Sequence, residues 1–452
     1  MLKEDAQAIW RAGVLAVDSH VLVSQQLAVQ EGQLRVRDKT IPLEWIRRIV
    51  VVGAGKAGAG MAAAVEEVLE PVKEKIDGWV NVPADCVESL QRIRLHSARP
   101  AGVNEPRPEG VKGTQKILKL AKSCRHEDLC LVLLSGGGSA LLPMPCAGIS
   151  LEDKLQVVQL LMSAGARIDE LNAVRKQLSA VKGGKLARAS GAGWTVGLII
   201  SDVVGDRLDV IASGPTVPDS STPQQALQIL KKYARQPTDV PESVWKVLNE
   251  RAQAASDSDA VSRHFPLNVE NHIIGNNKTA VQVAAEEAER RGYKTFILGY
   301  DEQGVASEVG RTLARLAKQV RDQGSPVIPP ACLLSGGEPV VHLTPTDQPR
   351  KGGRNQELVL AALDELWEDG MDRIVILSGG TDGEDGPTDA AGAIASRKII
   401  EAAKQQGLNP KPFLQINDSY TFFEQVGGLW KTGPTHTNVM DLRVVLVAPS
   451  SA

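Results

Sequence analysis

Two serines flank three consecutive glycines in the segment Leu134-Ser135-Gly136-Gly137-Gly138-Ser139-Ala140. Consecutive glycines let backbone N–H groups point toward one place, and their missing side chains leave room for a phosphate. The chain has no G-x-x-x-x-G-K-[ST], and Leu141 stands where a G-x-S-x-G motif requires its second glycine, so neither a Walker A loop nor a nucleophile elbow is present. We therefore interpret Ser135, Gly136, Gly137, Gly138 and Ser139 as a phosphate-binding nest, with a plain turn as the alternative.

A second glycine motif, Gly53-x-Gly55-x-x-Gly58, follows a short apolar run and matches the dinucleotide fingerprint. The fingerprint also requires an acid at the end of the next strand, where this chain has Asn81-Val82-Pro83. Within the motif, Lys56 precedes an expected helix, and a cation at a helix start is disfavoured by the helix dipole. We therefore expect Lys56 to bind an anion, although a solvated surface lysine would look the same in the sequence.

Acidic side chains follow two further apolar runs. Asp202 lies just past the run 195–200, and Asp382 lies in the loop Ser378-Gly379-Gly380-Thr381-Asp382-Gly383-Glu384. Carboxylates at strand ends can hold Mg²⁺ or accept a hydroxyl proton. We therefore take Asp202 and Asp382 as candidate metal ligands or bases, with a helix N-cap as the alternative for Asp202.

Arg354 and Asn355 stand at the start of the apolar helix expected at residues 358–366. The planar guanidinium of an arginine can bind a carboxylate or a phosphate through two hydrogen bonds. We therefore expect Arg354 to bind an anionic group, with Asn355 beside it on the substrate. The seven histidines show no H-x-x-x-H or similar spacing, so the sequence indicates no zinc site.

The elements that position these residues alternate between helix and strand, which is typical of an α/β fold with parallel sheets. Ser-Gly-Gly ends an apolar run three times, at residues 135–137, 335–337 and 378–380. In open α/β sheets ligands bind beyond the carboxyl ends of the strands, so these turns are candidate ligand contacts. A helical pattern is expected at residues 4–30. Strands are expected at 49–52, 78–82, 129–134, 195–200, 273–274, 295–298, 331–334, 374–377 and 444–447.

The length of 452 residues exceeds what one core usually supports, so two domains are expected. The most polar stretch, around residues 255–270, predicts the boundary. We place the N-terminal domain at residues 1–262 and the C-terminal domain at residues 263–452.

Composition narrows the class of protein. A net charge of −3 argues against a nucleic-acid surface. No apolar run approaches the roughly 18 residues of a membrane helix, and the first residues resemble neither a secretory signal nor a transit peptide. The five cysteines form no C-x-x-C pair, which is typical of a reducing compartment. We therefore expect a cytoplasmic protein without nucleic-acid or membrane partners.

A glycine nest, a lysine, an arginine and strand-end carboxylates together suit phosphoryl transfer, which works mainly by positioning and charge stabilisation. Seven motifs in this order closely resemble the class II glycerate kinases, which carry a C-terminal module called MOFRL, and the animal-type members most of all. The motifs are Val52-Gly53-Ala54-Gly55-Lys56-Ala57, the nest with Leu134 and Ala140, Ser201-Asp202-Val203-Val204-Gly205-Asp206, Ser213-Gly214-Pro215-Thr216, Ser335-Gly336-Gly337-Glu338-Pro339, Gly352-Gly353-Arg354-Asn355-Gln356-Glu357 and Ser378-Gly379-Gly380-Thr381-Asp382-Gly383. The sequence departs from many relatives at His436, where they have glycine.

The resemblance implies two Rossmann-like α/β domains with mostly parallel sheets that flank a central active-site cleft. It implies ATP and Mg²⁺ as cosubstrate and cofactor, D-glycerate as substrate and 2-phosphoglycerate as product. Lys56 and Arg354 correspond to the cleft lysine and arginine of that family, the nest to its nucleotide-phosphate loop, and Asp202 and Asp382 to acids near its site. Transfer to the C3 hydroxyl, an NAD(P)H-dependent hydroxypyruvate reductase and a non-catalytic sensor of sugar phosphates stay open as alternatives, as does a homo-oligomer.

Overall fold

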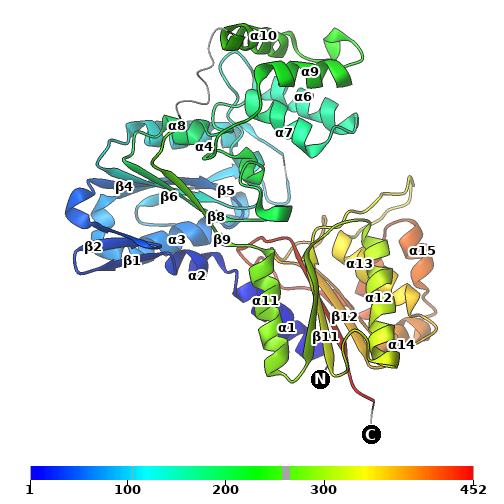
Figure 1. Cartoon of the computed structure of the whole chain (residues 1–452). Helices are drawn as coiled ribbons and strands as arrows, with labels where there is room; N and C mark the ends of the chain where they lie inside the picture. The colour runs from blue at the N-terminus through cyan, green and yellow to red at the C-terminus, as the bar shows by residue number, and fades with distance from the viewer. Residues whose placement is uncertain (1, 104, 257–264, 451–452) are drawn as a thin grey trace. The chain divides into compact units, whose positions relative to one another are not determined.

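The computed structural model describes residues 2–103, 105–256 and 265–450 (Figure 1). They divide into two compact units, which we call the middle unit, Ser19–Ile274, and the terminal unit, Met1–Asp18 with Gly275–Ala452. The predicted boundary between residues 262 and 263 lies outside the described residues. The units differ from the predicted domains because the first residues of the chain belong with its C-terminal part.

The middle unit is built on a six-stranded sheet of order β6-β5-β4-β7-β8-β9. The pairs β5–β6, β4–β5, β4–β7 and β7–β8 are all parallel. The strands are β4 (Arg48–Ala54), β5 (Ile76–Pro83), β6 (Ile93–Arg99), β7 (Asp128–Leu134), β8 (Trp194–Ile200) and β9 (Val269–Gly275). This confirms the five strands predicted in this part of the chain and adds β6, which the sequence reading missed.

Helices cover this sheet and also form a group of their own (Figure 1). The helices that follow strands of this sheet or cover it are α3 (Gly58–Val68), α4 (Pro108–Ser123), α5 (Gly138–Leu141) and α8 (Lys185–Ala189). The helical group consists of α6 (Leu151–Ser163), α7 (Ile168–Gln177), α9 (Pro223–Tyr233) and α10 (Glu242–Ser256). It has a separate apolar core that includes Val157, Leu171, Leu230 and Leu248. Each of these helices therefore turns an apolar face toward the group and leaves its other side for polar residues.

A small antiparallel sheet, β1-β2-β3, corrects the helix predicted over residues 4–30. The helix α2 (Ser19–Ser24) ends before β1 (Leu27–Gln30), which is followed by β2 (Gln33–Val36) and β3 (Lys39–Pro42). Glu31 and Gly32 both have positive φ, which is the requirement of the tight hairpin turns that match strand twist. Leu34 and Val36 are buried in alternation with exposed residues, so the local pattern has the period of a strand.

The terminal unit contains a mixed sheet of order β10-β11-β15-β12-β13-β14. Its strands are β10 (Lys294–Glu302), β11 (Ala331–Gly337), β12 (Ile374–Gly380), β13 (Gly392–Ser396), β14 (Leu429–Trp430) and β15 (Asp441–Val447). All four strands predicted here are present, but the expectation of a mostly parallel sheet is wrong for this unit. Only β10 and β11 pair in parallel, and β15 is antiparallel to both β11 and β12. Short apolar runs indicate strands buried on both faces, and they carry no information on strand direction.

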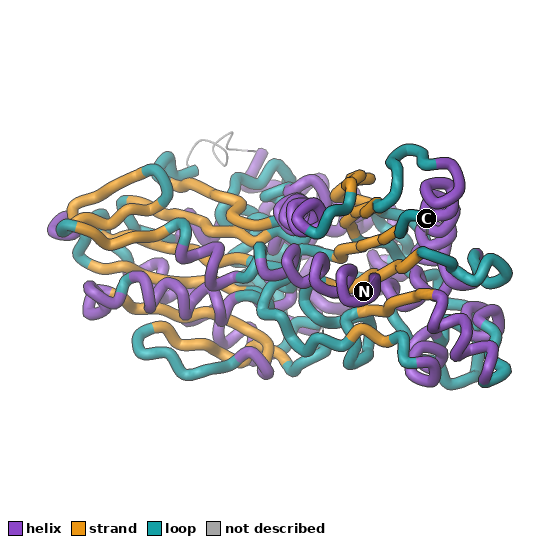
Figure 2. The backbone as a smooth tube through the Cα atoms, turned by 90° about the horizontal axis from the view of Figure 1, so that it is seen from below, coloured by secondary structure: helices purple, strands orange, loops and turns teal. Residues whose placement is uncertain are grey.

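Helices lie on both faces of this sheet (Figure 2). One face packs on α12 (Ala306–Gln323), α13 (Arg354–Glu365), α14 (Arg397–Gln405) and α16 (Ser419–Val426), with α15 (Pro410–Gln415) beside them. The other face packs on α11 (Asn277–Arg290) and on α1 (Leu2–Leu15), the first helix of the chain. Ile9, Trp10 and Val14 of α1 are buried against residues such as Val444, and this apolar stripe is the reason why α1 belongs to the terminal unit. None of the helices in the described residues is long and apolar enough to cross a membrane.

Candidate active site

The nest and the first glycine loop form one interlocked structure in the middle unit. They follow β7 and β4, which are neighbours in the sheet. The backbone N–H of Lys56 donates to the carbonyl of Gly136 at 2.9 Å, and the N–H of Ala57 donates to Ser135 Oγ at 3.0 Å. The chain then turns at Gly137, whose φ of +77° favours glycine, into the short helix α5. Each loop therefore holds the other in place at the carboxyl end of the sheet.

The glycines of the first loop serve this close packing. A Cβ atom at position 53 would overlap the carbonyl oxygen of Leu133, and one at position 55 would overlap Ser135 Oγ. The space beside Gly53 is thus filled by Leu133 of β7, and the space beside Gly55 by the nest. Asn81 stands where a dinucleotide-binding fold has its ribose acid, and its buried amide donates to the carbonyl of Leu141 at 2.8 Å. The loop therefore lacks both the room and the acid that a dinucleotide needs.

Lys56, which the sequence predicted to bind an anion, lies beside the nest. A Cβ atom built on Gly137 would be 3.5 Å from Lys56 Cγ and 3.6 Å from Nη2 of the buried Arg99. The middle unit thus brings two cationic side chains next to the glycines that were predicted to bind phosphate. Arg99, at the end of β6, was not among the predicted site residues.

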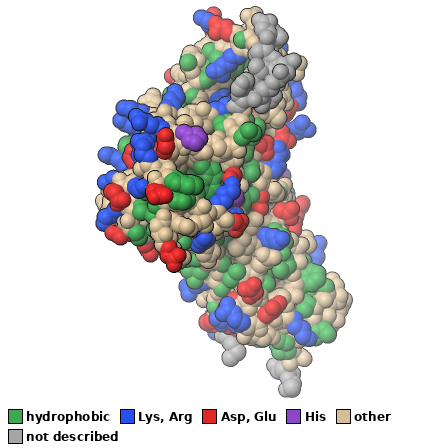
Figure 3. Space-filling model, turned by 60° about the vertical axis from the view of Figure 1, so that its left-hand side comes forward, with side chains coloured by type: hydrophobic (Ala, Val, Ile, Leu, Met, Phe, Trp, Pro, Cys, Tyr) green, Lys and Arg blue, Asp and Glu red, His purple; other side chains and the backbone are tan. Residues whose placement is uncertain are grey.

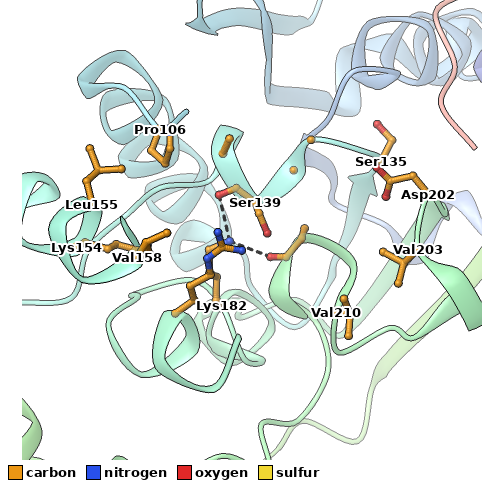
Figure 4. Close-up of a pocket in the computed structure, with 15 residues that line it drawn as sticks. Pro106, Ser135, Ser139, Lys154, Leu155, Val158, Lys182, Asp202, Val203 and Val210 are labelled. Atoms are coloured by element: carbon orange, nitrogen blue, oxygen red, sulfur yellow. Dashed lines mark hydrogen bonds between the residues drawn. The ribbon is translucent and has the colours of Figure 1, made fainter. Parts of the chain in front are cut away.

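A pocket of about 260 Å³ opens on the other side of the nest (Figure 4). It is smaller than the ~300–1,000 Å³ of most drug-sized ligand pockets, a size that suits a small polar group. The pocket combines nest residues, residues of α6 and α7 and the loop after β8. Its lining residues are Pro106, Ser135, Gly137, Gly138, Ser139, Ala140, Lys154, Leu155, Val158, Arg175, Lys182, Asp202, Val203, Val210 and Ala212.

Lys182 fixes one wall of this pocket. Its ammonium is buried and donates to the carbonyls of Ser139 and Ala212, both at 3.2 Å, and to Ser213 Oγ at 3.3 Å (Figure 4). Ser213 Oγ also lies 3.0 Å from Ser139 Oγ. Ala212 and Ser213 both have positive φ, a conformation that is costly for non-glycine residues and that the Lys182 contacts help to maintain. Lys182 therefore ties the nest to the Ser213-Gly214-Pro215-Thr216 turn.

Two more cations line the pocket, and sequence reasoning missed both together with Lys182. Lys154 comes from α6 and Arg175 from α7. Burial, reinforced by the charge of Arg175, lowers the pKa of Lys154 to about 7. Burial also lowers the pKa of Arg175. The available signal was the stretch 175–185, which contains four basic residues and no acid.

The charge in the pocket contrasts with the surface. On the face shown in Figure 3, basic and acidic side chains are intermixed. Among the described residues that line the pocket, Lys154, Arg175 and Lys182 face a single carboxylate, Asp202. A buried concentration of positive charge next to backbone N–H donors is an environment for an anion.

Of the two predicted carboxylates, Asp202 lies in the pocket with the nest, whereas Asp382 belongs to the terminal unit. Among the described residues no group of three or more His, Cys, Asp or Glu side chains could hold a metal ion. Mg²⁺ is commonly held by one or two carboxylates, several waters and the phosphates of a substrate. Asp202 fits that pattern as a single protein ligand to a Mg²⁺ that arrives with a nucleotide.

Arg354, in the terminal unit, already binds two carboxylates. Its Nε and Nη2 donate to Asp441 at 2.7 and 2.9 Å, and its Nη1 lies 2.9 Å from Glu338. Asp441 is fully buried, while about a third of the Arg354 side chain is exposed. Burial lowers the pKa of Arg354, but the charge and hydrogen bonds of Asp441, together with the charges of Glu338 and Asp385, outweigh burial and raise that pKa. The guanidinium is thus held rigidly, with an exposed part next to Glu338 at the wall of a second pocket of about 520 Å³.

Asn355 does not face a ligand in this structure. It is fully buried, and its Nδ2 donates to Asp385 at 3.2 Å. Asp385 also accepts the backbone N–H groups of Asn355 and Gln356, at 3.0 and 2.8 Å, and so caps α13. Asn355, which the sequence predicted to contact the substrate, therefore holds the helix start that carries Arg354 in this structure. Asp382 is half-buried and accepts the N–H of Glu384 at 3.0 Å within its own loop.

The three Ser-Gly-Gly turns differ in what fills them. The turn at 135–137 opens to the pocket. The turn at 335–337 is occupied by the buried Arg443, which donates to the Gly336 carbonyl at 3.1 Å. A Cβ atom on Gly379, in the third turn, would be 3.1 Å from the indole nitrogen of Trp10. Of the three turns, the first thus lines a pocket, whereas a buried side chain packs into each of the other two.

Comparisons with known proteins show which family the chain resembles. Residues 5–249 match the family described as "Domain of unknown function (DUF4147)", and residues 331–441 match the MOFRL family. A human "Glycerate kinase" is 37% identical and covers 99% of this chain and 94% of its own. A "D-glycerate 2-kinase" of Thermotoga maritima is 38% identical over 91% of this chain and 94% of its own. A crystal structure of glycerate kinase from Thermotoga maritima superposes with a TM-score of 0.84 at 37% identity, covering 99% of both chains.

The chain belongs to the glycerate kinase family. The family resemblance predicted from seven short motifs is thereby confirmed over nearly the whole length. A further relative, from Agrobacterium vitis, carries the name "Putative hydroxypyruvate reductase". It is 40% identical to this chain and covers 88% of this chain and 87% of its own.

Proposed function

We propose that this glycerate kinase transfers the γ-phosphoryl group of ATP to the 2-hydroxyl of D-glycerate and releases 2-phosphoglycerate and ADP. The observation that carries the proposal is the pocket in the middle unit, where the glycine nest, Asp202 and buried cations line one small cavity. Phosphoryl transfer needs positioned donors and positive charge rather than a protein nucleophile, and this cavity offers both.

In this proposal the nest and Lys56 bind the phosphates of ATP. Gly137 and Gly138 present backbone without side chains, Ser139 adds a hydroxyl, and Lys56 lies alongside Gly137. Mg²⁺ would neutralise charge on the phosphates, and Asp202 would hold it. Asp382 stays the alternative for orienting the hydroxyl.

Arg354 is proposed to bind the carboxylate of glycerate or the transferring phosphoryl group. Support comes from its rigid mounting: Asp441 fixes two of its nitrogens, and Asp385 and Asn355 fix the helix start that carries it. The exposed carboxylate of Glu338 on its third nitrogen is the partner that an incoming anion would replace. Such an exchange needs no movement of the guanidinium itself.

A second candidate function, NAD(P)H-dependent reduction of hydroxypyruvate, is favoured by the name of the Agrobacterium vitis relative. The glycine loop argues against it, because the nest fills the space beside Gly55 and Asn81 is buried. Incubation of the purified protein with hydroxypyruvate and NADH or NADPH, followed by absorbance, decides between the two. Steady oxidation of the nicotinamide would overturn the kinase proposal.

³¹P NMR of the reaction of ATP, Mg²⁺ and D-glycerate tests the kinase proposal directly. The expected product is 2-phosphoglycerate. A 3-phosphoglycerate signal would move the transfer to the C3 hydroxyl, and ligand binding without any new phosphorus signal would support a sensor instead. The Asp202→Asn variant in the same assay should need more Mg²⁺ for half-maximal rate.

A further inference from the structure

Lys154 is a buried lysine whose charged group has no hydrogen-bond partner. It lies on α6, only 4% of its surface is exposed, and its Nζ is unsatisfied among the described residues. Moving an ammonium group from water into the protein interior without a hydrogen-bond partner costs several kcal/mol of free energy. A lysine retained under these conditions has a purpose other than stability of the empty pocket.

The groups around Lys154 make its burial more unfavourable. Arg175 from α7 and Lys185 after it both disfavour the charged form, and Cys146 is the weakly compensating group. Lys182, on the same pocket wall, has its donors directed to protein oxygens. Among the described residues none accepts a hydrogen bond from Lys154, so its donors are available to a ligand.

The proposal follows from this geometry and rests on the proposed kinase function. We propose that Lys154 and Arg175 bind a phosphate oxyanion of the nucleotide, next to the glycine nest. Three cations against the single carboxylate of Asp202 match a multiply charged phosphate better than the single charge of a glycerate carboxylate. Lys154 acts as a point charge, and Arg175 can add a planar fork.

Lys154→Met tests the proposal, because methionine keeps the length of the side chain and removes the charge. We expect the KM for ATP to rise about 10- to 100-fold, the loss typical of a charged hydrogen bond, with a smaller change in the KM for D-glycerate. Thermal unfolding without ligand should occur at the same or a higher temperature. A purely structural lysine would give the opposite result, a lower melting temperature with unchanged KM values.

Lys185→Met is the matched control. Lys185 is a half-buried lysine of the basic stretch 175–185, but it does not line the pocket, and its Nζ donates to the carbonyls of Lys176 and Ser179 at 2.6 and 2.7 Å. Its replacement should lower the melting temperature and leave the KM for ATP within about twofold. Lys154→Arg should retain tight binding of ATP.

A second readout separates this proposal from the kinase function. Sulfate, which resembles a phosphoryl group, should raise the melting temperature of the unaltered protein in a saturable way and should have a much weaker effect on Lys154→Met. This result would support the pocket even if no kinase activity were found. Equal sulfate stabilisation of both proteins, or an unchanged KM for ATP in Lys154→Met, would overturn the proposal. A rise in KM confined to D-glycerate would overturn the assignment to the nucleotide.

Discussion

At the scale of single residues, the pocket contains two buried lysines in opposite situations. Lys182 donates to three oxygens and thereby fixes the backbone at Ala212 and the nest at Ser139. Lys154 has no such partner. A lysine with satisfied donors stabilises the fold, whereas one without them stores an unfavourable charge that a ligand can relieve.

The depressed pKa of Lys154 predicts how stability changes with pH. The pKa is about 7 in the folded state and about 10.4 in an unfolded chain, so the unfolded state binds more protons between these values and stability rises with pH there. From pH 7 to pH 9.5 the gain from this group is about 3 kcal/mol. Urea unfolding at both pH values gives the free energy of unfolding of the unaltered protein and of Lys154→Met. The contribution of Lys154 is the difference between the two proteins in how much this free energy rises from about pH 7 to about pH 9.5. Parallel pH profiles would contradict the prediction.

Arg354 needs a test that separates catalysis from folding. Arg354→Ala leaves the buried Asp441 without its main partner, so we expect a loss of about 3 kcal/mol in stability. The double variant Arg354→Ala/Asp441→Asn also removes the unpaired charge of Asp441 and should recover much of the lost stability. If Arg354 stabilises the transition state, kcat should fall on the order of 10³-fold in both. A double variant within tenfold of the unaltered kcat would remove Arg354 from that role, with Asp441→Asn alone as the control.

The candidate site could be predicted only in part from the sequence. The nest, Lys56 and Asp202 could be proposed because glycine-rich turns and charged residues at the ends of apolar runs can be recognised in the sequence. Lys154 could not be found, since a lysine between Asp153 and Leu155 in a helix has the pattern of a solvated residue. Its burial depends on α7 and the nest, which the local sequence does not encode.

At the scale of elements, the strands were predictable from their apolar runs, and their directions were not. Short apolar runs of the same kind form both β7, which pairs in parallel with β4, and β15, which pairs antiparallel to β11. Short or polar strands such as β6 and β14 were missed because their burial is incomplete or brief. The three Ser-Gly-Gly turns looked equivalent in the sequence, yet Arg443 fills the second and Trp10 packs on the third.

Because the two loops pack so closely, adding one methyl group at Gly53 should strongly destabilise the protein. Gly53→Ala would place a Cβ atom against the Leu133 carbonyl near the carboxyl end of the β4–β7 pairing, so we expect the free energy of unfolding to fall by at least about 2 kcal/mol. Gly299→Ala is the control, since its nearest neighbour, Asp301 Oδ1, would be 3.7 Å away. Chemical unfolding followed by circular dichroism compares the two variants. Equal stability of both would show that the loops can separate at little cost.

At the scale of the whole molecule, the helix α1 packs with the C-terminal part of the chain. The first helix completes the core of the terminal unit, where Trp10 packs edge-on against Trp430 with ring centroids 5.6 Å apart. A division of the chain by composition alone assigned this helix to the N-terminal domain, because a contact between residues more than 400 positions apart leaves no local signal.

Trp10→Ala should therefore weaken the terminal unit and spare the middle unit. Loss of this buried side chain is expected to cost about 3–5 kcal/mol. Hydrogen exchange read out by mass spectrometry should show faster exchange in β12 and β15, with peptides of β4 and β7 unchanged. Trp45→Ala, which replaces an exposed tryptophan, is the control. Faster exchange throughout both units would contradict the independent cores.

The position of β15 has a consequence for synthesis on the ribosome. Because β11 and β12 each pair with β15, the centre of the terminal sheet cannot close until the last strand has been translated. The apolar face of α1 must wait equally long, roughly 20–90 s at 5–20 residues per second. The middle unit is complete in the nascent chain well before then. The helix α1 is thus synthesised long before the strands on which Trp10 packs, and its apolar face stays without these partners for that time.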